Sequence, residues 1–509
     1  MLEKYGAKGV KLLDVFIRVL LYADDGALVA ASAVDLQCML DILKVYCSQW
    51  KMVVNVDKTV VIVFNHPSDT PRESYIFHYD GRVLSVVEQF KYLGLVFHES
   101  GSWTQMILNR LHAAKSLIAI WRRRFCTWVF NSCIVQRLFT TCVMPALDYG
   151  VPLWGVGPYS SADWKAVEAF WRASARTMVG VPKRTPTAAV FGDLGWYEYS
   201  VRAAYQSVKF LMRVIELSDS TLTRKALVVQ QQMCNRAEQM RISTWMVRLK
   251  GTLLLGPTYA VNLWSALEAS PGMHIDVKRV ILDESGIESE VRLEDEFFSA
   301  LKEYERGMWM REIQGVGKEQ GDYCVSERFE CENPVDANVR ALHVDQAGHK
   351  MRTYALCKPT FKLKFETYLQ CVESTYERQL LARFRMGVLP LRIETGRYEL
   401  CGFGGTKKGL PVEFRVCRCC DLCKVEDEIH FLLECPTFEQ PRRELIKISL
   451  HSIPGFGSLK EGGDVEGMFC AILSSDIAAV CCGTAQFIRR AFLLRFRILK
   501  RLLCTSKVL

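Results

Sequence analysis

The stretch Leu20-Leu21-Tyr22-Ala23-Asp24-Asp25-Gly26 decides how the beginning of the chain is interpreted. Apolar residues 15–22 and 27–31 flank it, and this pattern predicts two strands joined by a tight turn. The turn carries two adjacent carboxylates, Asp24 and Asp25. Adjacent negative charges favour a bound cation, and magnesium commonly takes one or two carboxylates among its oxygen ligands. Aspartate is also common in turns for local hydrogen-bonding reasons, so an ordinary turn is the alternative.

The residues around this turn predict mixed α and β structure. Ser32 and Asp35 have the spacing of a capping box, and apolar residues recur at helical intervals from 36 to 47. Residues 53–64 have a strand-like composition, and Asp80-Gly81 predicts a hairpin turn between 75–79 and 82–87. From about residue 105 to 217 the pattern is mainly helical, so the chain as a whole predicts an α+β fold.

Composition excludes several classes of protein. The chain has 509 residues, of which 50% are hydrophobic and 24% charged, and this composition excludes a wholly disordered protein. Its 20 cysteines are scattered rather than spaced as in a small secreted disulfide framework. No signal peptide or membrane span is apparent from the pattern of apolar residues. We therefore expect an intracellular protein of the nucleus or cytoplasm, not secreted, with no membrane partner.

A cysteine and histidine cluster predicts a zinc site near the C-terminus. Cys420-x2-Cys423-x6-His430-x4-Cys435 offers three thiolates and one imidazole, which close a tetrahedral structural site. Cys417-x2-Cys420 is a second CxxC pair, so either Cys417 or Cys420 can be the first ligand. Chance clustering among so many cysteines is the alternative.

Two sets of basic residues are candidates for contact with nucleic-acid phosphates. The net charge of +9 favours polyanionic partners only mildly, so the position of the cations matters more. Each set falls on an amphipathic segment that predicts a helix, 163–178 or the last thirty residues. The alternative for each is a solvated or packing face. The candidates are Lys165, Arg172, Arg176, Arg489, Arg490, Arg495 and Arg497.

Several motifs, taken in order, resemble one protein family. The sequence at 20–25, then Val53-Val54-Asn55-Val56-Asp57-Lys58-Thr59, then Phe90-Lys91-Tyr92-Leu93-Gly94, resembles three successive palm motifs of the reverse transcriptases of non-long-terminal-repeat, LINE-type retrotransposons. Segments at 145–155, 178–182, 383–397 and 420–435 resemble later parts of the same proteins. The ordered set touches most of the chain.

This resemblance implies a domain organisation and an activity. It implies a partial polymerase palm at 1–104, a helical thumb-like region at 105–220, a helical connector and linker at 221–350, and a C-terminal region with the zinc motif and a basic helix at 351–509. The implied reaction is RNA-directed DNA synthesis with magnesium, on an RNA template and a DNA primer. Asp24 is then the metal-binding aspartate and Asp25 a supporting carboxylate, while Lys58 assists the leaving pyrophosphate. Contacts to the nucleotide or primer are implied for Tyr22, Phe90, Tyr92, Leu93 and Gly94.

One element of the family's polymerase site is not found in the sequence. That site needs a further aspartate on a strand opposite the Asp24 hairpin. Asp14 lies on the approach to the hairpin's own first strand, so it cannot also lie opposite the hairpin. We therefore expect a truncated polymerase that lacks an N-terminal portion and is inactive alone, because two-metal catalysis depends on the geometry of all its ligands. The alternative is a non-catalytic, zinc-dependent nucleic-acid-binding protein.

Overall fold

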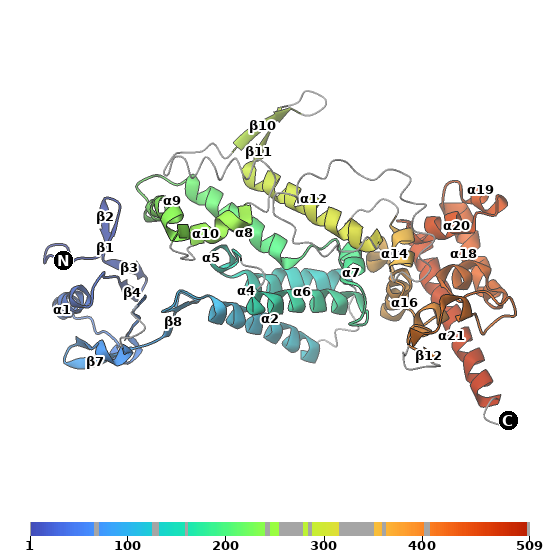
Figure 1. Cartoon of the computed structure of the whole chain (residues 1–509), viewed down its shortest axis with the longest axis horizontal. Coiled ribbons are helices and arrows are strands. Elements are labelled where there is room, and N and C mark those ends of the chain that lie inside the picture. Colours follow the sequence, from blue (N-terminus) through green and yellow to red (C-terminus); the bar gives the residue numbers. More distant parts are fainter. Residues whose placement is uncertain are drawn as a thin grey trace. The chain divides into compact units, whose positions relative to one another are not determined.

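The structure is a computed structural model that describes most of the chain (Figure 1). The described residues are 2–65, 71–124, 132–157, 161–239, 245–253, 278–282, 288–314, 351–358, 363–401 and 408–505. Within them, helices combine with small separate sheets, which confirms the α+β class. The linker expected near 315–350 lies outside the described residues.

The chain divides into two compact units, each drawn from three stretches of sequence. Unit 1 comprises Met1–Ala114, Ala146–Val167 and Ser200–Ala300. Unit 2 comprises Lys115–Pro145, Glu168–Tyr199 and Leu301–Leu509. The four consecutive regions expected from the sequence stay a prediction.

The strands of the described residues are short and pair mostly as antiparallel hairpins. Their bounds are β1 (Val10–Leu12), β2 (Val15–Ile17), β3 (Val19–Tyr22), β4 (Asp25–Leu28), β5 (Val60–Val61), β6 (Phe77–Tyr79), β7 (Arg82–Val86), β8 (Gln89–Tyr92), β9 (Leu95–His98), β10 (Lys278–Leu282), β11 (Glu288–Arg292), β12 (Leu400–Cys401) and β13 (Lys408–Gly409). Among these described strands, β5 and β7 are the one parallel pair, within the sheet β5-β7-β6.

The predicted hairpin turns are confirmed, and two strand predictions need correction. The run 15–22 is not one paired strand, because β2 pairs back with β1 whereas β3 pairs with β4. The run 53–64 is mostly not strand. Asn55 accepts a hydrogen bond from the Lys58 N–H at 3.2 Å and caps a 3-10 turn, so only β5 is extended enough to pair.

The first helix of unit 1 begins where the capping box predicts. Ser32 is the N-cap of α1 (Ala33–Gln49), and its hydroxyl accepts from the Asp35 N–H at 3.1 Å. Leu40 of this helix belongs to a buried cluster with side chains of the β5-β7-β6 sheet, which include Phe77 and Leu84. Helix and sheet therefore share one small core.

Helices make up most of the remaining described residues. Their bounds are α2 (Thr104–Arg124), α3 (Ser132–Leu138), α4 (Met144–Asp148), α5 (Val151–Trp154), α6 (Ala162–Val179), α7 (Thr187–Leu194), α8 (Tyr199–Ile215), α9 (Leu222–Gln239), α10 (Trp245–Leu253), α12 (Leu293–Gln314), α14 (Arg352–Cys357), α15 (Thr367–Cys371), α16 (Thr375–Arg385), α17 (Arg392–Thr395), α18 (Glu439–Ser452), α19 (Phe456–Glu461), α20 (Val465–Leu473) and α21 (Ala478–Thr505). No single helix of the described residues has the length and apolar character of a membrane span, although α20 and α21, bent by 110°, pass that test as a pair.

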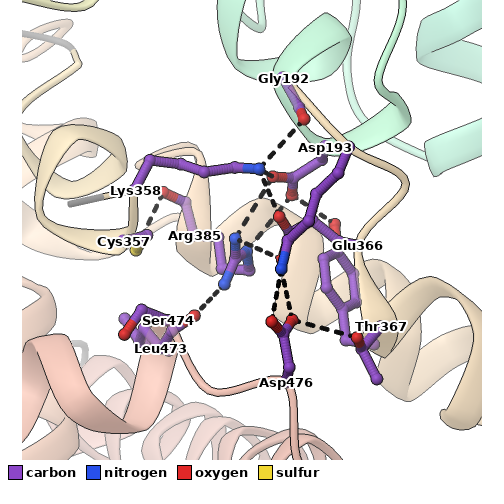
Figure 2. A network of polar contacts seen from close by, with 12 residues as sticks. Gly192, Asp193, Cys357, Lys358, Glu366, Thr367, Arg385, Leu473, Ser474 and Asp476 are labelled. Carbon is purple, nitrogen blue, oxygen red and sulfur yellow. Dashed lines mark hydrogen bonds and ion pairs between the residues drawn. The ribbon is translucent and has the colours of Figure 1, made fainter. Parts of the chain in front are cut away.

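A buried network of charges joins several elements of unit 2 (Figure 2). Asp193 of α7 is fully buried, and Arg385 of α16 lies 3.3 Å from its carboxylate. Glu366 pairs with both Lys358 and Arg385, so the network contains two cations and two anions. Arg385 also donates to the Leu473 carbonyl. Burial disfavours the charged carboxylate, yet Arg385 and Lys358 outweigh it and lower the pKa of Asp193. The four charges balance, so the network holds α7 against α16 without an unpaired buried ion.

Candidate functional site

The hairpin of β3 and β4 presents the two predicted catalytic carboxylates at its tip. Tyr22 pairs with Asp25 across a two-residue turn, and Ala23 adopts the left-handed conformation with a φ of 52°. Asp24 and Asp25 are exposed, and among the described residues neither side chain makes a hydrogen bond or an ion pair. Tyr22 beside them is 64% exposed. The turn therefore holds two uncommitted carboxylates, a donor set of the type that magnesium takes.

Other acidic residues near this part of the sequence are already paired. Asp14 forms an ion pair with Lys225, Asp57 with Arg82, and Asp80 with Lys44. Within the part of the chain that the structure describes, no third carboxylate or histidine gathers with Asp24 and Asp25 at the distance of a shared ion. Lys58 is exposed at the end of the 3-10 turn and has no hydrogen bond or ion pair with either carboxylate.

The second sequence-predicted contact region is the turn between β8 and β9. Leu93 and Gly94 both have positive φ, 48° and 80°, in a two-residue turn between Tyr92 and Leu95. The Tyr149 hydroxyl donates to the Leu93 carbonyl at 2.6 Å. A Cβ at Gly94 would lie 3.0 Å from the Tyr149 ring, so glycine is required there for both conformation and space.

The side chains of this turn remain accessible. Phe90 is 39% exposed and Leu93 is 38% exposed, while Tyr92 is half-buried. The turn is thus fixed from behind by Tyr149 and presents part of its apolar surface outward.

Four side chains of unit 2 form a candidate metal centre. The ligand atoms of Cys417, Cys420, His430 and Cys435 all lie within 4.8 Å of one another. The Cys420 Sγ lies 3.4 Å from His430 Nε2. Three sulfurs and one imidazole nitrogen match the closed tetrahedral set of structural zinc. Cys417 also belongs to a second possible group, with Cys419 and Glu426.

The local fold explains why this set begins at Cys417. Residues 415–426 form a hairpin, in which the Cys417 N–H donates to the Lys424 carbonyl at 2.8 Å and the Glu426 N–H donates to the Arg415 carbonyl at 3.0 Å. Cys423 stands at the exposed end of this hairpin with a φ of 52°, outside the four-residue set. Of the four ligands expected from the sequence, the structure brings together Cys420, His430 and Cys435, and the alternative first ligand, Cys417, completes the set.

Contacts outside the cluster orient its ligands. His430 Nδ1 lies 3.4 Å from Glu434 Oε2, so the carboxylate can accept the ring N–H while Nε2 points toward the cysteines. Lys424 binds the same carboxylate at 2.9 Å. Arg442 of α18 donates to the Cys435 carbonyl at 2.7 Å, which fixes the last ligand from behind.

A buried ion pair ties the hairpin to the C-terminal helix. Arg495 of α21 makes two hydrogen bonds of 2.7 Å to the carboxylate of Glu426. Both side chains are buried. Arg495 is among the residues predicted to contact phosphate, but its guanidinium is bound to Glu426 inside the protein.

Other cations of the predicted phosphate-binding sets also have partners within the protein, although the side chains of Arg172 and Arg489 remain partly exposed. Arg172 pairs with Glu198, Arg176 donates to the Thr185 carbonyl at 3.0 Å, and Arg489 pairs with Glu377 at 2.9 Å. Lys165, Arg490 and Arg497 are exposed on their helices. Amphipathic spacing predicts which face of a helix a cation occupies. It does not predict which acidic residue from a distant segment lies beside that cation.

Comparison with known proteins gives one informative match. No protein-family model matches the chain. A curated protein of Drosophila melanogaster, described as a probable RNA-directed DNA polymerase from transposon BS, is 24% identical over 223 residues. The match supports a reverse-transcriptase-like relationship. It covers 40% of this chain, and the chain spans 23% of the length of that polymerase.

Proposed function

We propose that the chain is part of an RNA-directed DNA polymerase of a LINE-type retrotransposon, which acts on an RNA template and a DNA primer. The observation that carries this proposal is the β3–β4 turn, which presents the carboxylates of Asp24 and Asp25 exposed and, within the described part of the chain, without a hydrogen-bond or ion-pair partner. The order of the sequence motifs and the relationship to a transposon polymerase support it.

Asp24 is the proposed magnesium ligand, with Asp25 as the supporting carboxylate. Magnesium prefers oxygen ligands and usually takes only one or two carboxylates from a protein, and two exposed carboxylates meet both conditions. The ion supplies charge stabilisation for the attacking and leaving oxygens of nucleotidyl transfer. Tyr22 flanks the nucleotide, Lys58 donates a proton to the leaving pyrophosphate, and the β8–β9 turn with Phe90 to Gly94 holds the primer.

The chain alone is proposed to be inactive in DNA synthesis. Asp24 and Asp25 gather no third carboxylate among the described residues, so two ions cannot both be held in place by them. We propose that the missing aspartate belongs to an N-terminal portion of the polymerase. The zinc of this protein is structural, held by Cys417, Cys420, His430 and Cys435.

Site-directed cleavage by iron tests the metal assignment without requiring polymerase activity. Fe²⁺ substitutes for Mg²⁺ at oxygen sites and, with ascorbate and peroxide, cleaves the backbone near the bound ion. We expect cleavage close to residue 24, protection by excess Mg²⁺, and loss of cleavage in the double variant Asp24→Asn, Asp25→Asn. Asp57→Asn is the matched control, because that carboxylate is exposed but already paired with Arg82. Equal cleavage in the double variant would refute the proposed site.

Primer extension tests the proposed inactivity separately. The purified chain should not extend a DNA primer on an RNA template with magnesium or manganese. Extension that is lost in Asp24→Asn would overturn the inactivity while supporting the polymerase assignment.

A further inference from the structure

The face of α18 that carries Arg443 and Lys447 forms one side of an open groove in unit 2. The groove has a volume of about 760 Å³ and lies between α18 and Lys460 of α19. Arg443, Lys447 and His451 follow one another at four-residue intervals, so they lie along one face of α18 about 6 Å apart. The full lining is Glu439, Arg442, Arg443, Ile446, Lys447, Leu450, His451 and Lys460.

The charge of this groove is positive and mostly uncommitted. Lys447, His451 and Lys460 are exposed, and none of their side chains makes a hydrogen bond or an ion pair among the described residues. Arg443 pairs with Glu439, but both side chains are more than half exposed, so water competes for that pair. Glu439 is the one acidic residue of the lining, against four Arg and Lys side chains.

The groove is held in place by the zinc region. Arg442, on the inner side of α18, donates to the carbonyls of Leu432 and Cys435 at 2.7 Å each. Leu445 and Ser449 of the same helix are fully buried, and Ile448 packs near Gly483 of α21. The cations therefore project from a helix whose opposite face is fixed.

We propose that this groove binds the phosphate backbone of a nucleic-acid strand. The inference rests on the proposed function and locates a nucleic-acid contact that the sequence assigned to other residues. Lys and Arg neutralise phosphates and release counterions, and an open groove lets a strand pass through. The lining has no Phe, Tyr or Trp side chain, and the His451 imidazole is its one ring on which a base could stack. The contact is therefore mainly to the backbone and largely independent of base sequence. Ile446 and Leu450 offer the apolar surface on which sugars pack.

Fluorescence anisotropy with the full zinc-loaded chain tests this inference. The probes are a 30-nucleotide RNA and a DNA of the same sequence, titrated at several salt concentrations. The groove variant is Arg443→Gln, Lys447→Gln, Lys460→Gln. The matched control is Lys4→Gln, Lys8→Gln, Lys11→Gln, which removes three exposed lysines of unit 1. We expect at least a tenfold loss of affinity in the groove variant, with a salt slope smaller by about 2 because three phosphate contacts are lost.

Each other outcome overturns the proposal in a distinguishable way. Equal loss in the control would mean that only net charge matters. Unchanged affinity in the groove variant, with intact zinc content, would exclude the groove but leave the polymerase proposal standing, since iron cleavage tests that independently. Competition by poly-glutamate as strong as that by RNA of equal charge would identify an acidic peptide as the occupant. Two further results would support the proposal. The affinities for RNA and DNA should be similar, because the contact is to the backbone. Lys447→Arg should retain binding, whereas Lys447→Gln should weaken it.

Discussion

At the scale of single residues, Cys417 and Cys423 stand at equal sequence distance from Cys420 but in different environments. Cys417 is buried beside Cys420, His430 and Cys435, whereas Cys423 is exposed. We predict that Cys417→Ser lowers zinc content from one ion per chain toward none, whereas Cys423→Ser leaves it unchanged. Metal analysis of the reduced, purified chain measures this directly. Zinc loss in Cys423→Ser with retention in Cys417→Ser would reverse the ligand assignment.

The sequence could predict the type of this site but not its register. Spacing shows that two CxxC pairs precede His430 and that either can supply both sulfurs to one turn. The choice depends on how residues 415–426 pair with one another and on the ion pair between Glu426 and Arg495, which are 69 residues apart. Such a long-range contact leaves no local signature, and for the same reason the sequence pattern does not reveal that Arg495 pairs with Glu426.

At the scale of elements, the pair Asp193 and Arg385 connects α7 to α16. Replacing Arg385 with Met would leave two buried carboxylates, Asp193 and Glu366, with Lys358 as the one cation of the network. The Tyr354 and Tyr368 hydroxyls would still donate to Asp193, but they carry no charge to balance it. We predict a loss of about 3–5 kcal/mol in the free energy of unfolding, since an uncompensated charge would remain in the interior. Urea unfolding followed by tryptophan fluorescence measures it, because Trp171 and Trp196 stack with ring centroids 4.4 Å apart in the same unit.

The exposed pair of Arg443 and Glu439 provides the control for this prediction. Arg443→Met should change the unfolding free energy by less than about 1 kcal/mol, because water already screens that pair. The double variant Arg385→Met, Asp193→Asn should lose less than the sum of the two single variants. Additive losses, or a loss in Arg385→Met no larger than in Arg443→Met, would mean that the network contributes little.

Prediction of the elements themselves succeeded where a local signal decides the structure. The Ser32 cap and the Asp80-Gly81 turn depend on hydrogen bonds and backbone conformations within a few residues, and both are found. The run 15–22 has the composition of one strand, but whether it pairs with one partner or two depends on β1 and β4. Pairing partners are tertiary information, so composition alone could not divide the run.

At the scale of the whole molecule, the candidate zinc centre and the β3–β4 turn belong to different compact units. Because a preformed site does not exist in the unfolded chain, zinc binding contributes folding free energy only to the region that its ligands order. The region that depends on the metal includes α18, where Arg442 donates to the carbonyl of the ligand Cys435, and α21, where Arg495 pairs with Glu426 of the hairpin. The core of Leu40, Phe77 and Leu84 in unit 1 contains no ligand of the centre.

Removal of zinc should therefore affect the two units differently. We predict that a zinc-selective chelator increases hydrogen exchange by at least tenfold in peptides covering 415–452 and at the Arg495 end of α21, because the hairpin loses the bonds that fix its ligands. Exchange in peptides covering α1, β6 and β7 should stay within twofold of the zinc-loaded chain. Mass spectrometry of the same sample before chelation, after chelation and after zinc is restored measures all these regions together. Uniform acceleration across both units would mean that the metal stabilises the entire chain, and an unchanged 415–452 region would mean that the cysteine and histidine cluster folds without it.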